Sequence, residues 1–286
     1  MSEQENDHII KLKDGRKLAY AEYGDPEGQP LFFLHGWPSS RMHGRRMGEA
    51  ASKLKIRIIT PDRPGYGLSD YKENRTLLDY PDDILELADQ LKIEKFAVVG
   101  VSGGGPYAAV CAYKIPTRIT KVGIVVGLGP THIKNAFYGT SIMAKLGWSN
   151  YGRVPLLPDL AALIQFTQTR YLPRFHKLGF RSKADQAMMD KDFNKSITKT
   201  TKEAFRQGIK GPALDLKLYT KDWGFDLGKI KSKVYLFYGA DDKNVSLNMG
   251  KYYASKIPNS KLVVYPDEGH FIQITHAEEI LKTLTS

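Results

Sequence analysis

The sequence predicts an α/β fold with a doubly wound, mostly parallel sheet into which a helical cap is inserted. Three observations carry this prediction. Short apolar runs of strand length alternate with helical patterns along both ends of the chain, as in a parallel sheet covered by helices on both faces. A hairpin pattern opens the chain, so the first strands are expected to be antiparallel. The alternation stops at Gly129-Pro130 and resumes near Lys231, which leaves room for the cap.

The first elements are two strands, expected at residues 9–12 and 17–23, where apolar and polar side chains alternate. Asp14-Gly15 between them is a strong hairpin signal. Residues 31–34 follow as a continuous apolar run, which suits a strand that is covered on both faces. The sheet is therefore expected to begin with an antiparallel edge and to continue into a buried centre.

The remaining strands and helices alternate at the spacing of βα units. In residues 76–91, apolar side chains recur every three or four positions, as on the buried face of a helix. Further strands are expected at residues 56–60, 121–126, 234–238 and 261–265 and at the start of segment 96–106, and further helices at 107–113, 247–257 and 271–284. This order predicts parallel strands whose carboxyl ends share one edge of the sheet.

The predicted core consists of residues 1–130 and 226–286, and the predicted cap of residues 131–225. Residues 131–221 hold 16 Lys and Arg against 6 Asp and Glu, so most of the net charge of +11 lies in the cap. A solvated helical surface is the first interpretation of this excess. Attraction to an acidic partner, a membrane surface or an anionic substrate is the alternative.

Composition argues against several classes of function. No apolar run approaches the roughly eighteen residues of a membrane-spanning helix. The first residues are polar and acidic, so we expect a cytoplasmic protein without stable membrane insertion. No nucleic-acid-binding motif accompanies the basic region, and no Cys/His cluster or HExxH motif suggests a metal. Cys111, the single cysteine, excludes an internal disulfide and suits a packing role.

The central motif for function is Gly100-Val101-Ser102-Gly103-Gly104, between an apolar strand and a helix. A G-x-S-x-G pattern in this context is typical of a nucleophile elbow, a strained turn that the flanking glycines permit. A cradle for a dinucleotide phosphate would need an acidic residue at the end of the next strand, and that strand offers none. A chance glycine turn stays open on this motif alone.

Two further polar residues follow strands of the predicted sheet. Asp242 comes just after the strand at 234–238, and His270 just after the strand at 261–265. Because the carboxyl ends of parallel strands meet at one edge, we expect both side chains to lie near Ser102. A nucleophile, a base and an orienting acid would then be combined at this edge.

With these motifs the chain resembles the α/β-hydrolase superfamily over residues 9–284. The resemblance rests on five short sequences, each at the end of a predicted strand: HGWP, DRPGYGLSD, GVSGGG, GADDKNV and DEGHF. It implies the α/β-hydrolase fold, in which the triad follows the order serine, aspartate, histidine along the chain. One departure is Ser246, where many relatives have proline, and it leaves the catalytic positions unaffected.

The resemblance also implies a role for each member of the triad. Ser102 is then the nucleophile and His270 the base. Asp242 is the acid, as the third residue after Gly239, and Asp241 is the alternative acid. Serine at the elbow argues against the relatives that carry aspartate there, the haloalkane dehalogenases and most epoxide hydrolases.

Around the triad, the resemblance assigns the two oxyanion donors to the backbone N–H groups of Trp37 and Gly103. It implies no cofactor. The residues that we expect to line the substrate pocket are Arg41, Trp148, Leu156, Leu157 and Phe271.

The expected function is that of a serine hydrolase that cleaves a carboxylic ester through an acyl-serine intermediate. Its expected partner is a small, apolar acyl substrate, and no nucleic acid. Two alternatives stay open: a triad hydrolase of an amide, lactone or carbon–carbon bond, and a non-catalytic protein of this fold that binds a small molecule. A nicotinamide-dependent oxidoreductase is the third class considered, and the missing acidic residue argues against it.

Overall fold

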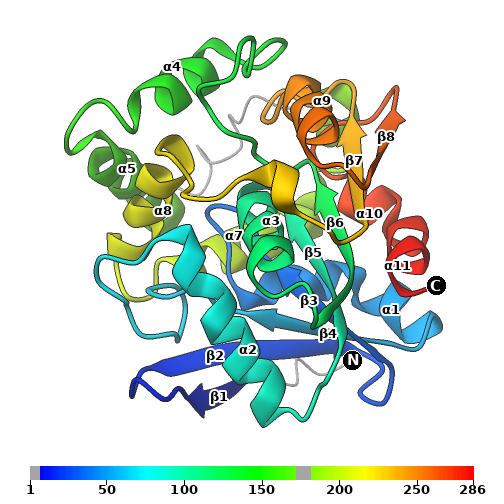
Figure 1. The fold of residues 1–286 in the computed structure, drawn as a ribbon. Helices are drawn as coiled ribbons and strands as arrows, with labels where there is room; N and C mark the ends of the chain where they lie inside the picture. Colours follow the sequence, from blue (N-terminus) through cyan, green and yellow to red (C-terminus); the bar gives the residue numbers. More distant parts are fainter. Residues whose placement is uncertain (1–6, 172–181) are drawn as a thin grey trace.

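The computed structural model describes residues 7–171 and 182–286, apart from the side chains of residues 143 and 144. One eight-stranded sheet crosses the molecule in the order β1-β2-β4-β3-β5-β6-β7-β8 (Figure 1). The strands are β1 (Asp7–Lys11), β2 (Lys17–Gly24), β3 (Gln29–Leu34), β4 (Ile56–Pro61), β5 (Phe96–Val101), β6 (Ile119–Val125), β7 (Val234–Gly239) and β8 (Ser260–Tyr265). This strand order is the doubly wound arrangement that the sequence predicts.

The opening hairpin forms the antiparallel edge of the sheet. β1 pairs antiparallel with β2, and β2 pairs antiparallel with β4, whereas all the other neighbouring pairs are parallel. Gly15 turns the hairpin at a φ of +90°, which glycine adopts without strain. The N–H of Leu12 donates to the carbonyl oxygen of Arg16 at 2.8 Å. The predicted antiparallel start is therefore confirmed.

Helices cover both faces of the sheet, as expected. One face carries α2 (Tyr80–Gln90), α3 (Gly105–Lys114) and α9 (Leu247–Lys256), and the other carries α1 (Gly48–Lys53) and α11 (Ala277–Thr285) (Figure 1). The six residues of β5 are all buried, and their side chains alternate between the apolar cores on the two faces. The central strands are thus covered on both sides, which explains their continuous apolar sequence.

The shorter helices adjust two of the predicted boundaries. The predicted helix at 76–91 begins with a 3₁₀ turn, Leu77–Asp79, before α2. The predicted closing helix is divided into α10 (Ile272–Thr275) and α11 at His276, whose ring stacks on that of Tyr265 in β8 with 3.9 Å between centroids. The other 3₁₀ segments are Arg41–Met47, Ser102–Gly104 and Leu227–Lys229.

Between β6 and β7 lie the residues predicted as a cap, 131–225, which we call the helical insertion. Its described helices are α4 (Ile142–Asn150), α5 (Leu157–Tyr171), α6 (Lys183–Ala187), α7 (Lys191–Ala204) and α8 (Lys210–Thr220). α4 and α5 lie at the outside of the molecule, and α8 lies beside α5 (Figure 1). A small apolar cluster around Tyr66, which includes Ala162 and Phe205, packs the insertion on the loop that follows β4.

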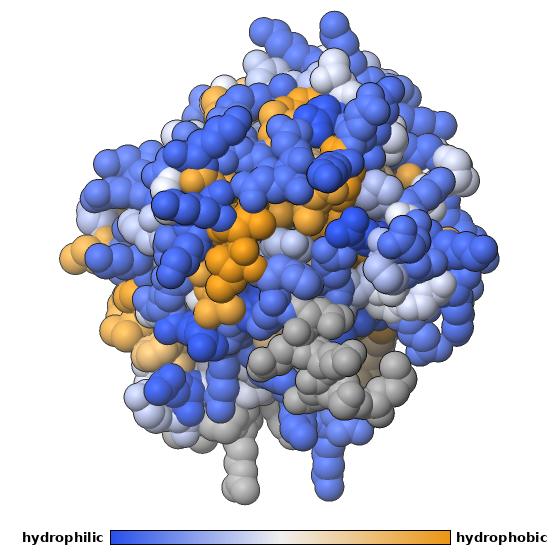
Figure 2. All heavy atoms as spheres, turned by 90° about the horizontal axis from the view of Figure 1, so that it is seen from below, coloured by the Kyte–Doolittle hydropathy of each residue, from blue (hydrophilic) through white to orange (hydrophobic). Residues whose placement is uncertain are grey.

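The side of the molecule that carries β1 and β2 is mostly hydrophilic. Figure 2 views this side from below and shows polar side chains over most of it, with apolar side chains gathered in a limited band. Across residues 7–171 and 182–286, no helix has the length and apolar character that crossing a membrane requires.

Candidate active site

Ser102 lies in a tight turn between β5 and α3. Its φ is +55°, in the left-handed region that residues with side chains rarely adopt. A side-chain carbon on Gly100 would lie 2.2 Å from the carbonyl oxygen of Gly104, and one on Gly104 would lie 2.1 Å from that of Leu34. The turn thus has both the strain and the glycine requirement of a nucleophile elbow, and it leaves Ser102 half-buried.

His270 and Asp242 lie together at the carboxyl edge of the sheet, in the loops that follow β8 and β7. Nδ1 of His270 is 2.7 Å from Oδ2 of Asp242. The other carboxylate oxygen accepts the N–H groups of Asn244 at 2.7 Å and Val245 at 3.0 Å. Because an ionised carboxylate only accepts hydrogen bonds, Nδ1 is the donor in this contact, and a neutral imidazole then has its lone pair on Nε2. This arrangement suits a general base and its orienting acid.

Asp241, the alternative acid, faces a different partner. Its carboxylate pairs with the ammonium group of Lys243 at 2.5 Å, and 40% of its side chain is exposed. The side chain of Asp242, by contrast, is fully buried against the imidazole of His270. The geometry therefore favours Asp242 over Asp241 as the partner of the histidine.

The loop that follows β3 lies against the elbow. A side-chain carbon on Gly103 would lie 3.1 Å from the backbone nitrogen of Trp37, and one on Gly36 would lie 3.3 Å from Cβ of Ser102. The N–H of Gly36 donates to Nδ1 of His43 at 3.3 Å. Burial and nearby positive charge hold the pKa of His43 well below its ordinary value, so the ring accepts in its neutral form. The predicted oxyanion donors, Trp37 and Gly103, are thus neighbours in space.

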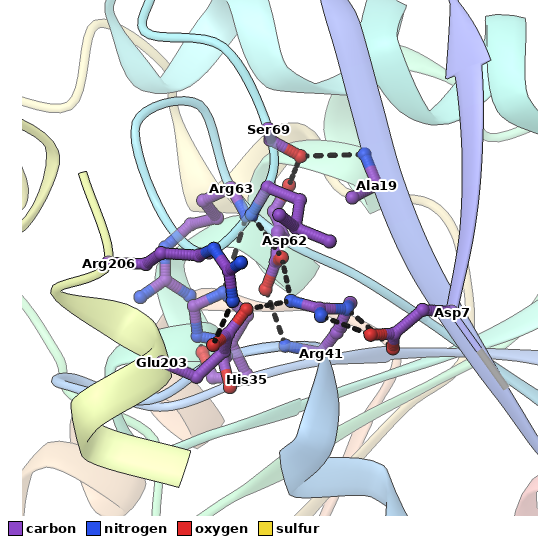
Figure 3. A network of polar contacts seen from close by, with 12 residues as sticks. Asp7, Ala19, His35, Arg41, Asp62, Arg63, Ser69, Glu203 and Arg206 are labelled. Carbon is purple, nitrogen blue, oxygen red and sulfur yellow. Dashed lines mark hydrogen bonds and ion pairs between the residues drawn. The ribbon is translucent and has the colours of Figure 1, made fainter. Parts of the chain in front are cut away.

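Arg63 is hydrogen-bonded to the backbone of the loop that follows β3 (Figure 3). Its guanidinium donates to the carbonyl oxygens of His35 and Gly36, the latter at 3.1 Å. The backbone N–H of Arg63 donates to Nε2 of His35 at 3.3 Å, and Nδ1 of that ring donates to the Gly36 carbonyl oxygen at 2.9 Å. Burial and the Arg63 charge hold the pKa of His35 well below its ordinary value. The imidazole of His35 is therefore neutral, both of its nitrogens are hydrogen-bonded to backbone groups, and its role is structural.

Asp215, on α8 of the helical insertion, is the buried counter-ion of this arginine. Its Oδ2 accepts from Nε of Arg63 at 2.7 Å, and its Oδ1 accepts from Arg75. Three tyrosine hydroxyl groups also donate to the carboxylate: Tyr66 at 2.7 Å, Tyr107 at 2.6 Å and Tyr219 at 3.2 Å. Burial alone would raise the pKa of Asp215, but the two guanidinium groups bring it below the ordinary value. Sequence reasoning missed this residue, since no local motif marks it.

A second missed residue, Asp185 at the start of α6, contacts the histidine loop. Its Oδ1 accepts the backbone N–H groups of His270 at 2.7 Å and Phe271 at 3.2 Å. The Ser182 hydroxyl accepts the N–H of Asp185 at 3.1 Å, which makes the two residues a helix cap. The Ser-x-x-Asp spacing predicts such a cap from sequence, but not that its carboxylate also reaches a loop 85 residues away.

Arg41 corrects one of the predicted pocket residues. Its side chain is buried, and its guanidinium pairs with Asp7, with Asp62 at 2.8 Å and with Glu203 of α7 at 2.7 Å (Figure 3). The backbone N–H of Arg41 also donates to Asp62, at 2.6 Å. The Arg41 guanidinium is thus paired with three carboxylates. It connects the first strand, the loop after β4 and the helical insertion, and it does not face a substrate.

Two of the predicted pocket residues pack close to the site. Trp148 on α4 meets the ring of Tyr219 edge to face, at 6.0 Å between centroids. The hydroxyl of Tyr219 lies 2.7 Å from where a side-chain carbon on Gly103 would stand, so these two rings connect α4 with the elbow. Phe271 is buried beside His270 and packs against Phe193 of α7 at 4.9 Å.

The other two predicted pocket residues flank the start of α5. Leu156 is 75% exposed, so it lies on the surface of the insertion, and its place in a pocket stays a prediction. Its φ of +64° turns the chain immediately before the helix. Leu157 is half-buried at the first position of α5.

No group of three or more His, Cys, Asp or Glu side chains in the described parts of the chain is arranged to hold a metal ion. Cys111 is buried in α3, and burial raises the pKa of its thiol, which suits the packing role expected for it.

Comparison with known proteins identifies the family of the chain. The family model described as alpha/beta hydrolase fold matches residues 29–277. An uncharacterized hydrolase of Saccharomyces cerevisiae is 30% identical to this chain over 96% of its length and 95% of the yeast protein. A bifunctional esterase/perhydrolase of Acinetobacter calcoaceticus is 25% identical over 96% of this chain and 97% of that protein.

A solved structure shows the same fold. The esterase of Exiguobacterium antarcticum superposes with a TM-score of 0.73 at 22% identity, over 96% of this chain and 97% of that one. At this identity the likeness concerns the fold. Because the family model spans most of the sequence and the yeast relative is similar along nearly its whole length, this chain belongs to the α/β-hydrolase fold family.

Proposed function

We propose that this protein is a serine hydrolase that cleaves a carboxylic ester by two-step acyl transfer. Ser102 is the nucleophile, His270 the general base and Asp242 its orienting acid. The observation that carries the proposal is the 2.7 Å contact between Nδ1 of His270 and the buried carboxylate of Asp242, at the edge of the sheet where the strained Ser102 stands. This contact leaves Nε2 able to take a proton.

In the first step, Nε2 of His270 takes the hydroxyl proton as Oγ of Ser102 forms a bond to the ester carbon. The negative charge moves to the carbonyl oxygen, where the N–H groups of Trp37 and Gly103 donate to it. Each such donor contributes about 3 kcal/mol to stabilising the transition state. The imidazolium then gives its proton to the leaving alcohol, and the C–O bond breaks.

In the second step, water attacks the acyl-serine carbon while Nε2 of His270 accepts one of its protons. Collapse of the intermediate returns the proton to Oγ of Ser102 and releases the carboxylic acid. Asp242 keeps the proton on Nδ1 and stabilises the imidazolium that forms in both steps. The reaction needs no cofactor.

We further propose that the helical insertion is a cap that selects an apolar acyl group. Trp148 and Phe271 support this role, because Trp148 connects through Tyr219 to the elbow and Phe271 adjoins His270. Leu157, half-buried at the start of α5, is the third apolar side chain that we assign to the pocket. Apolar walls with a few convergent polar groups are typical of small-molecule sites. The cap would then determine selectivity, while the triad determines the reaction.

Hydrolysis of p-nitrophenyl esters of increasing chain length tests the proposal. We expect turnover by the unaltered protein and a loss of kcat of roughly 10⁶-fold in Ser102→Ala. Asp242→Asn should lose about 10⁴-fold because the imidazole then adopts the wrong tautomer. Asp241→Asn is the matched control and should retain activity, since its carboxylate faces Lys243.

Labelling with a fluorophosphonate provides a test that does not depend on the substrate. Modification of Ser102 in the unaltered protein, and not in His270→Ala, supports an activated serine. An unmodified Ser102, or ester turnover that survives Ser102→Ala, contradicts the proposal. A parallel panel of amides and lactones separates ester cleavage from the hydrolysis of other bonds.

A further inference from the structure

Exposed apolar side chains concentrate in one part of the helical insertion. Twelve large apolar side chains are exposed in the described residues, and nine of them lie between residues 138 and 171. The nine are Tyr138, Ile142, Leu146, Val154, Leu156, Leu160, Leu163, Ile164 and Tyr171. Single exposed apolar residues are ordinary, but a concentration of them is typical of a surface that binds another protein or a membrane.

α5 shows that this exposure has a pattern. Leu160, Leu163, Ile164 and Tyr171 are 46–66% exposed, and their spacing places them on one face of the helix. The opposite face buries Pro158, Ala162 and Thr169, which are small or polar. Phe166 is half-buried and packs on Phe205, with 6.0 Å between ring centroids. Most of the large apolar side chains of α5 nevertheless face outward, which is unusual for a helix that packs only against its own core. We call Leu156, Leu160, Leu163, Ile164 and Tyr171 the α5 outer face.

The charge around the α5 outer face is positive. Arg153 precedes it and Arg170 lies within the last turn of the helix, and both are exposed. Residues 131–171 contain four basic residues, and Asp159 is their only acidic residue. Its carboxylate already pairs with Lys217 of α8 at 2.7 Å. An occupant of this face must therefore be apolar and must carry negative charge at its border.

We infer that the α5 outer face docks on an anionic phospholipid surface. An amphipathic helix can lie at a bilayer interface with its apolar side chains between the headgroups and its basic side chains on anionic lipid phosphates. A second copy of this chain fits less well, because a two-fold contact would bring the same basic side chains together. The docking is peripheral, since no described helix is able to cross a membrane.

Co-sedimentation with lipid vesicles tests the inference independently of catalysis. The unaltered protein should pellet with vesicles of phosphatidylglycerol and phosphatidylcholine, and much less with phosphatidylcholine alone. Binding should weaken as salt rises, because screening reduces the attraction of Arg153 and Arg170 to the headgroups. The double variant Leu163→Asp/Ile164→Asp should lower the partition coefficient by roughly tenfold or more, since two apolar contacts are lost.

Matched controls come from exposed apolar residues elsewhere in the chain. Ile9→Asp on β1 and Val264→Asp on β8 change side chains that are 54% and 37% exposed, and both variants should bind vesicles like the unaltered protein. Circular dichroism and turnover of a soluble ester confirm that each variant is folded, because none of these residues belongs to the proposed site.

Three results would overturn the inference. In the first, the unaltered protein fails to pellet with anionic vesicles. In the second, the Leu163→Asp/Ile164→Asp variant binds as well as the controls. In the third, the unaltered protein is a dimer by light scattering and does not bind vesicles, and the double variant is a monomer. This last result would make the α5 outer face a contact between copies.

Discussion

The two sides of the helical insertion are attached to the molecule in different ways. α7 and α8 reach the core through carboxylates, since the half-buried Glu203 pairs with Arg41 and the fully buried Asp215 pairs with Arg63. α5 rests on Ala162 and on the half-buried Phe166, and it presents most of its large apolar residues to solvent. Buried charged groups thus join the inner side to the core, whereas α5 is joined by apolar packing and by the half-exposed ion pair between Asp159 and Lys217.

This difference separates two tasks within one inserted segment. The buried carboxylates act on the loops that carry the proposed chemistry: Asp215 through Arg63 on the carbonyl groups of His35 and Gly36, and Asp185 on the backbone of the histidine loop. The inner side is thus part of the frame of the candidate site. The outer side has no such constraint, so its surface is available for recognition.

Among variants that test the difference between the two sides, Asp215→Ala should have the largest effect on stability. Removal of the carboxylate leaves Arg63 and Arg75 buried without a counter-ion, which should lower the free energy of unfolding by about 3–5 kcal/mol. Urea unfolding followed by circular dichroism measures this loss. The matched control is Asp159→Ala on the outer side, where a half-exposed pair with Lys217 is worth at most about 1 kcal/mol.

Equal losses in the two variants would contradict the proposed difference between the sides. Dependence on pH is a second check on the Asp215 prediction, because the pKa of Asp215 lies below its ordinary value in the folded protein. Its contribution to stability is therefore complete above the unfolded-state pKa of about 3.9 and is lost as pH falls below it. A difference in stability between the unaltered protein and Asp215→Ala that grows as pH falls below about 3.9 would contradict this prediction.

The chain's local patterns were sufficient for the fold and for the position of the proposed triad. The alternation of apolar runs and helical patterns predicts a parallel sheet, and in a parallel sheet Asp242 and His270 lie at the same edge as Ser102. The elbow, too, is a local feature, because its glycines and its turn lie within five consecutive residues, 100–104. These predictions needed no knowledge of which distant side chains meet.

Arg41, Asp215 and Asp185 all depend on contacts between segments that are far apart in the sequence. Arg41 follows the HGWP loop closely enough to suggest a substrate contact, yet its partner Glu203 lies 162 residues further along the chain. Asp215 and Asp185 act on loops 152 and 85 residues away, and no spacing rule connects such positions. Leu156 was expected in the pocket because apolar side chains commonly form pocket walls, and in the structure it is exposed just before α5.

A smaller effect is expected from Asp185→Ala, and mainly on catalysis. The variant removes the carboxylate oxygen that accepts the backbone N–H groups of His270 and Phe271, so the position of the imidazole is less fixed. We expect kcat for a p-nitrophenyl ester to fall about tenfold with little change in KM, equivalent to one hydrogen bond. Asp185→Asn keeps the acceptor oxygen and should restore most of the rate.

Asp190→Ala provides the matched control for this prediction. Asp190 caps α7 by accepting the N–H of Phe193 at 2.7 Å. Its carboxylate accepts no described hydrogen bond from the histidine loop, which this cap reaches only through the packing of Phe193 on Phe271. Its removal should cost about 1 kcal/mol of stability and leave kcat unchanged. An equal loss of kcat in both variants would assign the Asp185 effect to loss of a helix cap.

The smallest expected effects distinguish the two faces of α5 itself. Leu163→Gln changes a side chain that is 46% exposed and keeps helix propensity, so the free energy of unfolding should change by no more than about 0.5 kcal/mol. Ala162→Leu, one position earlier, adds volume to a fully buried contact and should cost about 1–3 kcal/mol. Thermal or urea unfolding of both variants measures the difference. A substantial loss in Leu163→Gln would mean that the α5 outer face is covered by the protein's own chain, and it would remove the physical basis for a docking surface.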